Sequence, residues 1–126
     1  MGEIKRNSTN CVNWLKYIVP NNLSYAVSRI GGRWKLLILS SLVDNTLRFS
    51  QIREAVEGIT ERMLILQLKE LEKELLIKRT VYNEAPSRVE YELTPLALDL
   101  VPIWRDLELW GAKHRDAVQA AGEMQP

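Results

Sequence analysis

A basic stripe runs along the segment at residues 60–75, which has the periodicity of an amphipathic helix. At about 100° per residue, one side of that helix carries four residues: Arg62, Leu66, Lys69 and Lys73. The opposite side carries an apolar stripe: Leu64, Leu68, Leu71 and Leu75. An arginine can bind O6 and N7 of guanine in a fork, whereas lysines more often bind phosphate. The segment therefore has the chemistry of a helix that lies in the major groove of a DNA duplex.

Two interpretations of this stripe stay open. Charged stripes are common on solvated helices, where the basic residues form ion pairs with acids four positions away. Leu66 is equally ambiguous, because it can contact a thymine methyl group or be a single exposed leucine that has no function.

Further candidate DNA contacts lie outside this helix. Arg48 and Ser50 stand at the start of a short helix that Ser50 can cap, and both can bind the DNA backbone there. Thr60 opens the stripe-bearing helix. Arg88 lies near the tip of a predicted hairpin, where a long cation can enter the minor groove, although it can also be an ordinary surface arginine.

The elements that must position these side chains follow from changes in periodicity along the chain. The pattern predicts helices over 11–19, 21–30, 33–43, 50–56 and 60–75, strands over 77–82 and 89–93, and a last helix from 95 to 111 or somewhat beyond, kinked at Pro102. This order is that of a winged helix-turn-helix, which is mainly α with a small β-hairpin wing. We expect a single domain over residues 1–126, with a DNA-binding core over 33–94 that contains the recognition helix (60–75) and the wing (77–93).

Composition limits the classes of function. The chain has 126 residues, 46% of them hydrophobic, and a net charge of +1, so the overall charge does not indicate a nucleic-acid partner and only a segregation of charge can. Cys11 and His114 are the only cysteine and histidine, which leaves no metal-ligand spacing and no nucleophile–base pair. Gly31-Gly32 is a helix break rather than a phosphate-binding loop. We expect no enzyme activity, no cofactor, no membrane partner and a cytoplasmic location.

Several blocks of sequence, in the right order, resemble the HxlR-type regulators. The blocks are IGGRWKLLIL (30–39), LRFSQI (47–52), GITERML (58–64), QLKELE (67–72) and PSRVEYELT (86–94). The resemblance covers roughly residues 21–111.

The resemblance implies a MarR-like winged-helix homodimer that binds double-stranded DNA at a two-fold related operator. It also implies that the first and last helices, here 11–30 and 95–118, join the two copies. The candidate interface residues are Trp14, Tyr17, Leu23, Trp104, Leu107 and Trp110. Their aromatic rings suit a buried interface, but some of them can belong to the core of one chain instead.

Three departures from the family pattern bear on function. Asn21-Asn22 stand where many members carry a cysteine that senses electrophiles or oxidants, so that sensor is missing. We expect Cys11, ten residues earlier, to pack as a small hydrophobic residue rather than to react. Ile65 stands where the family often has a small hydroxyl residue. The segment before residue 20 has no counterpart. A small-molecule effector can bind between the wing domain and the dimer helices, although no polar cluster identifies one.

The rival interpretation is a winged helix that binds another protein. The pI of about 7.8 and the apolar side chains of Ile65 and Leu66 on or beside the basic face favour it. Added salt discriminates between the two, since binding to phosphates weakens steeply with salt whereas an apolar interface responds little.

Overall fold

The computed structural model describes residues 21–123, and the chain divides into two compact units, residues 1–32 and 33–126. The described part of the first unit is helix α2 (Asn22–Ile30), which confirms the helix predicted over 21–30. The helix ends at its C-cap Gly31, whose backbone is extended, and Gly32 follows with φ +96°, a conformation that glycine adopts without strain. The helix predicted over 11–19 lies outside the described residues, and the single domain over 1–126 stays a prediction.

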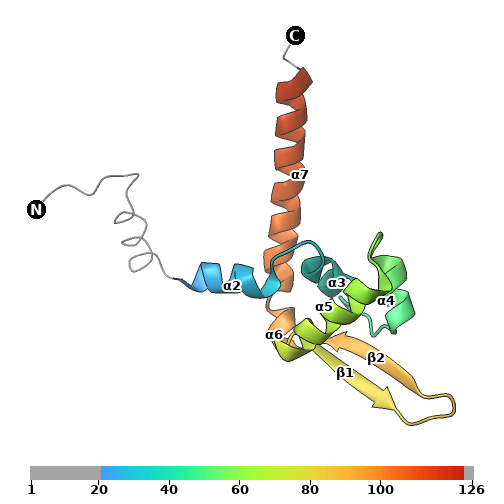
Figure 1. Cartoon of the computed structure of the whole chain (residues 1–126). Coiled ribbons are helices and arrows are strands. Elements are labelled where there is room, and N and C mark those ends of the chain that lie inside the picture. The colour runs from blue at the N-terminus through green and yellow to red at the C-terminus, as the bar shows by residue number, and fades with distance from the viewer. Residues whose placement is uncertain (1–20, 124–126) are drawn as a thin grey trace, which may run out of the picture. The chain divides into compact units, whose positions relative to one another are not determined.

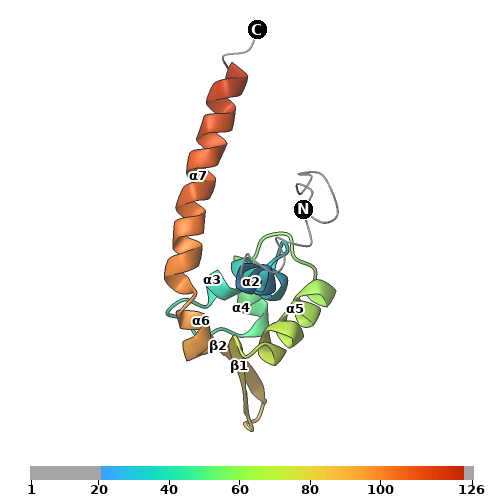
Figure 2. The ribbon, with the colours of Figure 1, turned by 90° about the vertical axis from the view of Figure 1, so that its left-hand side faces the viewer.

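The second unit has the predicted order of elements (Figure 1). It contains α3 (Lys35–Ser41), α4 (Phe49–Ala55), α5 (Glu61–Lys73), β1 (Ile77–Tyr82), β2 (Arg88–Leu93), α6 (Pro95–Leu98) and α7 (Val101–Glu123). The fold is therefore mainly helical with one antiparallel hairpin, as the sequence predicts. In Figures 1 and 2 the hairpin projects from one end of the unit and α7 extends in the opposite direction. No helix within residues 21–123 combines the length and apolar character needed to span a bilayer.

Capping residues explain where α4 and α5 begin. Thr60 caps α5, its hydroxyl accepting a hydrogen bond from the backbone N–H of Met63 at 3.1 Å. The prediction that Ser50 caps α4 is wrong, because α4 begins at Phe49 and its N-cap is Arg48. An arginine side chain cannot accept a hydrogen bond, so Gln51 reaches back instead, its Oε1 accepting from the backbone N–H of Arg48 at 2.9 Å.

The hairpin has two distinct faces. Its register runs from Ile77 opposite Leu93 to Tyr82 opposite Arg88. Since side chains alternate along a strand, Arg79 shares the face of buried Ile77, whereas Lys78 lies on the other face. Both Lys78 and Arg79 are exposed. Backbone hydrogen bonds of 3.0 and 2.8 Å between Leu47 and Tyr91 fasten β2 to the segment before α4.

The core lies among α3, α4, α5 and the hairpin. Six large side chains are almost completely buried: Ile38, Leu39, Leu42, Ile52, Leu64 and Leu71. The prediction that Leu75 continues the apolar stripe of α5 is wrong, since the helix ends at Lys73 and Leu75 adopts φ +62° with 67% of its surface exposed. This left-handed residue reverses the chain, and Leu76, 5% exposed, enters the core in its place.

The last helix differs from the predicted kinked helix. It is two helices, α6 and α7, that are separated at residues 99–100, and Pro102 lies in the first turn of α7. Proline is tolerated there because the N–H groups of a first turn have no partner within the helix. Thr94 caps α6 by accepting from the backbone N–H of Ala97 at 3.2 Å and donates to the carbonyl of Leu75 at 2.7 Å, which ties α6 to the turn after α5.

Candidate nucleic-acid interface

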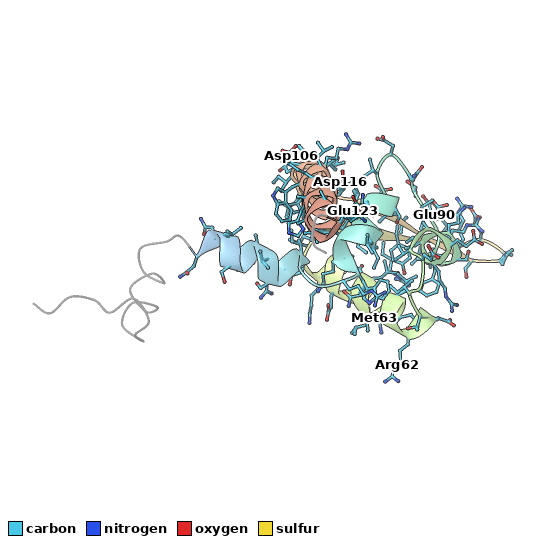
Figure 3. The ribbon with its side chains drawn as sticks, turned by 90° about the horizontal axis from the view of Figure 1, so that it is seen from above. Arg62, Met63, Glu90, Asp106, Asp116 and Glu123 are labelled. Carbon is cyan, nitrogen blue, oxygen red and sulfur yellow. The ribbon has the colours of Figure 1, made fainter. Side chains whose placement is uncertain are left out.

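Helix α5 separates a buried face from an exposed basic face, as predicted. Leu64, Leu68 and Leu71 are 0–3% exposed and attach the helix to the core. The opposite face, hereafter the basic face, consists of Arg62, Leu66, Lys69 and Lys73, all of them exposed. In Figure 3 the labelled side chain of Arg62 projects away from α5 into solvent. Helix α4, the turn at 56–60 and α5 together form a helix-turn-helix in which α5 holds the outward position.

Two of the three glutamates of α5 pair with residues outside the basic face. Glu61 faces Arg53 of α4 at 3.8 Å, and Glu70 pairs with Lys35 of α3 at 2.8 Å. Arg62, Lys69 and Lys73 form no ion pair with any residue that the structure describes. No acidic residue stands four positions before or after Arg62, Lys69 or Lys73, so the i,i+4 pairs of a solvated charged face are not available to these cations. Glu61 and Glu70 instead join α5 to α4 and α3, while Glu72, the third glutamate of α5, is exposed and lines the same surface hollow as Lys69 and Lys73.

Thr60 fixes where this face begins. Its side chain satisfies a backbone N–H of the first turn of α5, which would otherwise lack a partner. The preceding turn contains Gly58 at φ +86° and the buried side chain of Ile59. Together these residues set the direction in which α5 leaves the turn, and hence the direction of Arg62.

Loss of the Thr60 cap is expected to destabilise the fold. Thr60→Ala should lower the free energy of unfolding by about 1 kcal/mol, the usual contribution of an N-cap. Urea denaturation at fixed protein concentration measures this, and Thr60→Ser is the control because serine keeps the accepting oxygen. Equal stability of the alanine variant and the natural chain would show that the cap contributes nothing here.

Arg48 and Ser50 lie at the N-terminal end of α4, where the sequence places them. Both side chains are exposed, and neither forms a side-chain hydrogen bond or an ion pair with a described residue. Because Ser50 has no capping role, its hydroxyl is available to a ligand, and the N-terminus of α4 favours an anion next to it.

Arg88 differs most from its predicted role. It is the first residue of β2 and not a free tip residue: its guanidinium pairs with Glu84 at 2.6 Å and with Glu90 at 3.1 Å, and its side chain is 30% exposed. The guanidinium carbon also lies 4.2 Å from the centre of the Tyr82 ring. In this structure Arg88 thus joins the two strands and the loop of the hairpin, and its predicted contact at the minor groove stays a prediction.

The partners of Arg88, which are Tyr82, Glu84 and Glu90, were not predicted from the sequence. The pairing of Tyr82 with Arg88 depends on the hairpin register, which the sequence alone leaves open. Side chains two residues apart lie on the same face of a strand, so the spacing of Arg88 and Glu90 could have predicted their ion pair from the sequence.

The candidate dimer residues fall into three groups. Trp14 and Tyr17 lie outside the described residues, and Leu23, on α2, is 73% exposed. Leu107 and Trp110 of α7 are 53% and 58% exposed, so large apolar surfaces remain on that helix. Trp104 is only 8% exposed and packs in the core of its own chain, which leaves little of its ring for a second copy.

Residues 21–123 contain no cluster of three or more histidine, cysteine or acidic side chains that could hold a metal ion. What the second unit presents is a helix-turn-helix with an outward basic helix, followed by a two-stranded wing. This arrangement defines a winged helix-turn-helix protein.

Comparison with known proteins identifies the family. The sequence model described as HxlR-like helix-turn-helix matches residues 29–119, and the chain belongs to this family. It is 44% identical over 105 residues to an uncharacterized HTH-type transcriptional regulator of Methanothermobacter thermautotrophicus, covering 83% of this chain and 80% of that one. The chain is also 37% identical over 109 residues to the HTH-type transcriptional regulator YybR of Bacillus subtilis, covering 83% of this chain and 87% of YybR.

Solved structures agree with the fold. The redox regulator HypR in its reduced form superposes with a TM-score of 0.74 at 36% identity, over 79% of this chain and 98% of that chain. A MarR-family regulator from Porphyromonas gingivalis superposes with a TM-score of 0.69 at 31% identity, over 88% of this chain and 97% of that chain. The chain is thus a helix-turn-helix transcriptional regulator with a MarR-like winged-helix fold.

Proposed function

We propose that this regulator binds double-stranded DNA sequence-specifically, as a homodimer on a two-fold related operator. Helix α5 lies in the major groove and the hairpin lies beside the minor groove. The observation that carries this proposal is that the three cations of the basic face are exposed and form no ion pair with a described residue, on the outward helix of a helix-turn-helix.

Each residue of the basic face has a role that follows from its position. Arg62 is in the first turn of α5, the part of a recognition helix that meets base edges, and its fork suits guanine. Lys69 and Lys73, further along, bind phosphates. Leu66 and its neighbour Ile65, 48% and 41% exposed, are available to thymine methyl groups.

Residues outside α5 complete the contact. Arg48 and Ser50 bind backbone phosphate at the N-terminus of α4, and Thr60 positions the first turn of α5. Arg88 reaches DNA only if a phosphate displaces Glu84, so we assign it a smaller share of the affinity than a free wing-tip arginine would have.

The proposal is tested by measuring binding of the purified protein to the DNA upstream of its own gene and to a scrambled duplex of the same length, across a salt series. Specific binding that weakens steeply with salt supports a DNA-binding regulator, with a slope of about −0.9 per phosphate contact. A well-folded protein that binds neither duplex at low salt would contradict it.

The alternative is a winged helix that binds another protein through the same face. The exposed apolar side chains of Ile65 and Leu66 favour it. Under this alternative, binding to the partner would change little with salt, and neither duplex would be bound.

Lys73 is expected to bind a phosphate and to carry no sequence information. Lys73→Gln should weaken binding to the operator and to the scrambled duplex about equally, and should reduce the magnitude of the salt slope by about 1. Fluorescence anisotropy at several salt concentrations measures both effects. Lys113→Gln is the control, since it makes the same change at an exposed position on α7. An unchanged slope for Lys73→Gln would remove this residue from the interface.

A further inference from the structure

The hairpin holds one arginine between two carboxylates and an aromatic ring. The Nε of Arg88 donates a hydrogen bond to Glu90 at 3.1 Å, and its Nη1 donates to Glu84 at 2.6 Å. The guanidinium carbon lies 4.2 Å from the centre of the Tyr82 ring. The register explains the arrangement, because Tyr82 stands directly opposite Arg88 and Glu90 follows two residues later on the same face. These four side chains, hereafter the wing cluster, combine two carboxylates with one guanidinium and are therefore negative overall.

The two carboxylates of the wing cluster differ in how firmly they hold Arg88. Glu90 belongs to β2 itself and is only 22% exposed, whereas Glu84 comes from the loop between the strands and is 51% exposed. An ion pair with an exposed partner contributes little to stability, because water solvates the separated charges well. Glu84 can thus leave the guanidinium at small cost, while Glu90 and the ring of Tyr82 keep it in place.

The nitrogen that Glu84 occupies is the one that a DNA phosphate can take over. A phosphate has the negative charge and the acceptor oxygens that make a carboxylate bind an arginine fork, so the two groups compete for the same donors. Arginine has five N–H donors, and the hydrogen bonds to Glu84 and Glu90 are those that Arg88 forms with described residues. Donors therefore remain for a second oxygen of the incoming group.

We propose that Glu84 competes with DNA phosphate for Arg88 and thereby limits the affinity of the wing for any duplex; this inference rests on the proposed function. In the free protein Glu84 holds Nη1 of Arg88. In the complex a phosphate replaces it, and Glu90 is the positioning residue that keeps Nε in place during the exchange. Because phosphates are the same on every duplex, this competition lowers affinity without reading sequence.

Removal of the competing charge should strengthen DNA binding. Glu84→Gln is expected to raise affinity for the operator and for the scrambled duplex about 5-fold each, the upper range for an exposed ion pair. It should also increase the magnitude of the salt slope by about 1, since Arg88 then neutralises a phosphate without losing a partner. Fluorescence anisotropy across a salt series measures both effects. Glu92→Gln is the matched control, because it makes the same change on the same face of β2, opposite Lys78 and outside the wing cluster, and it should change affinity less than about 2-fold.

The role of Arg88 is tested by repeating both substitutions in an Arg88→Gln background. Glu84→Gln should there give no larger gain than Glu92→Gln, because no guanidinium is left to release. Two results would overturn the competition: equal gains from Glu84→Gln and Glu92→Gln in the natural chain, or a gain from Glu84→Gln that persists in full without Arg88. Either would mean that Glu84 acts only as a general negative charge near the DNA.

The role of Glu90 is tested in the Glu84→Gln background. Glu90→Ala should return the salt slope to that of the natural chain, because the guanidinium is no longer held in position. Glu90→Gln should keep the steeper slope, since its amide oxygen still accepts from Nε of Arg88. A general charge effect predicts the opposite for Glu90→Ala, which removes a further negative charge. Equal slopes for the two variants would refute the positioning role.

The outcomes separate this inference from the proposed function. If the natural chain binds its operator specifically and Glu84→Gln changes neither affinity nor slope, only the competition is refuted. If the natural chain binds no duplex at low salt, the proposed function fails, and Glu84→Gln still decides about Arg88. Salt-sensitive binding gained by that variant would support the competition, and its absence would overturn it. Circular dichroism checks that each variant is folded.

Discussion

Replacement of Arg62 by alanine is expected to lower affinity for the operator about 5- to 150-fold, which corresponds to 1–3 kcal/mol, and to change affinity for random DNA much less. Arg62 is in the first turn of α5, projects away from the protein in Figure 3 and forms no ion pair with a described residue. Its guanidinium is therefore free to bind a base edge, and no intramolecular contact has to break first. A bidentate contact to guanine is lost completely in the alanine variant, so the loss depends on sequence.

The measurement is a pair of titrations for each variant, one with the operator and one with a scrambled duplex at the same salt concentration. Arg105→Ala is the control, since Arg105 is an exposed arginine on α7 and its removal changes the net charge equally. Equal losses on both duplexes would make Arg62 a phosphate contact. No loss on either would place it outside the interface.

The periodic parts of the fold were predictable from the sequence. A spacing of 3.6 residues gives α5 its buried and basic faces, and the change to β-branched and aromatic residues after Leu76 gives the hairpin. Thr60 and Thr94 were also recognisable as caps, because their chemistry is local and needs only the next three residues.

The misplaced residues depend on geometry that is not periodic. Leu75 fits the apolar stripe by spacing alone, but the left-handed turn at that residue sends its side chain outward. The full set of intramolecular partners of Arg88 could not be predicted either, since the hairpin register brings Tyr82 opposite it and two carboxylates lie within 3.1 Å of its guanidinium. A hollow of about 310 Å³ beside α5 is lined by residues of α4, α5 and both strands, and no spacing within one segment indicates that these residues lie together.

The near-neutral charge of the chain also has a structural explanation. A net charge of +1 does not by itself indicate a nucleic-acid partner, but the total does not show where opposite charges meet. Glu61 and Glu70 face Arg53 and Lys35 within the fold, and Glu84 and Glu90 pair with Arg88 in the wing. Arg62, Lys69 and Lys73 form no such pair with a described residue, so their charge stays available on the exposed face of α5.

The largest effect on operator binding is expected from breaking the homodimer through α7. Four apolar residues on one side of this helix, here called the α7 stripe, are 53–59% exposed: Ile103, Leu107, Trp110 and Val118. Their spacing of 4, 3 and 8 residues keeps them on one helix face, and the ring of His114 stacks on that of Trp110 at 5.0 Å. A second copy that covers this stripe buries an apolar surface, which makes the stripe the described part of the proposed dimer contact.

The double variant Leu107→Glu/Trp110→Glu should be a folded monomer, because both side chains are more than half exposed in the single chain. A monomer binds only one half-site, so operator affinity should fall about 100- to 10,000-fold through loss of the second, linked contact. Analytical ultracentrifugation and operator titration measure the two effects, and circular dichroism checks the fold. Leu109→Glu is the matched control, since Leu109 is 70% exposed on a different side of α7. A double variant that stays dimeric, or a monomer that binds the full operator as tightly as the natural chain, would refute the role of the α7 stripe.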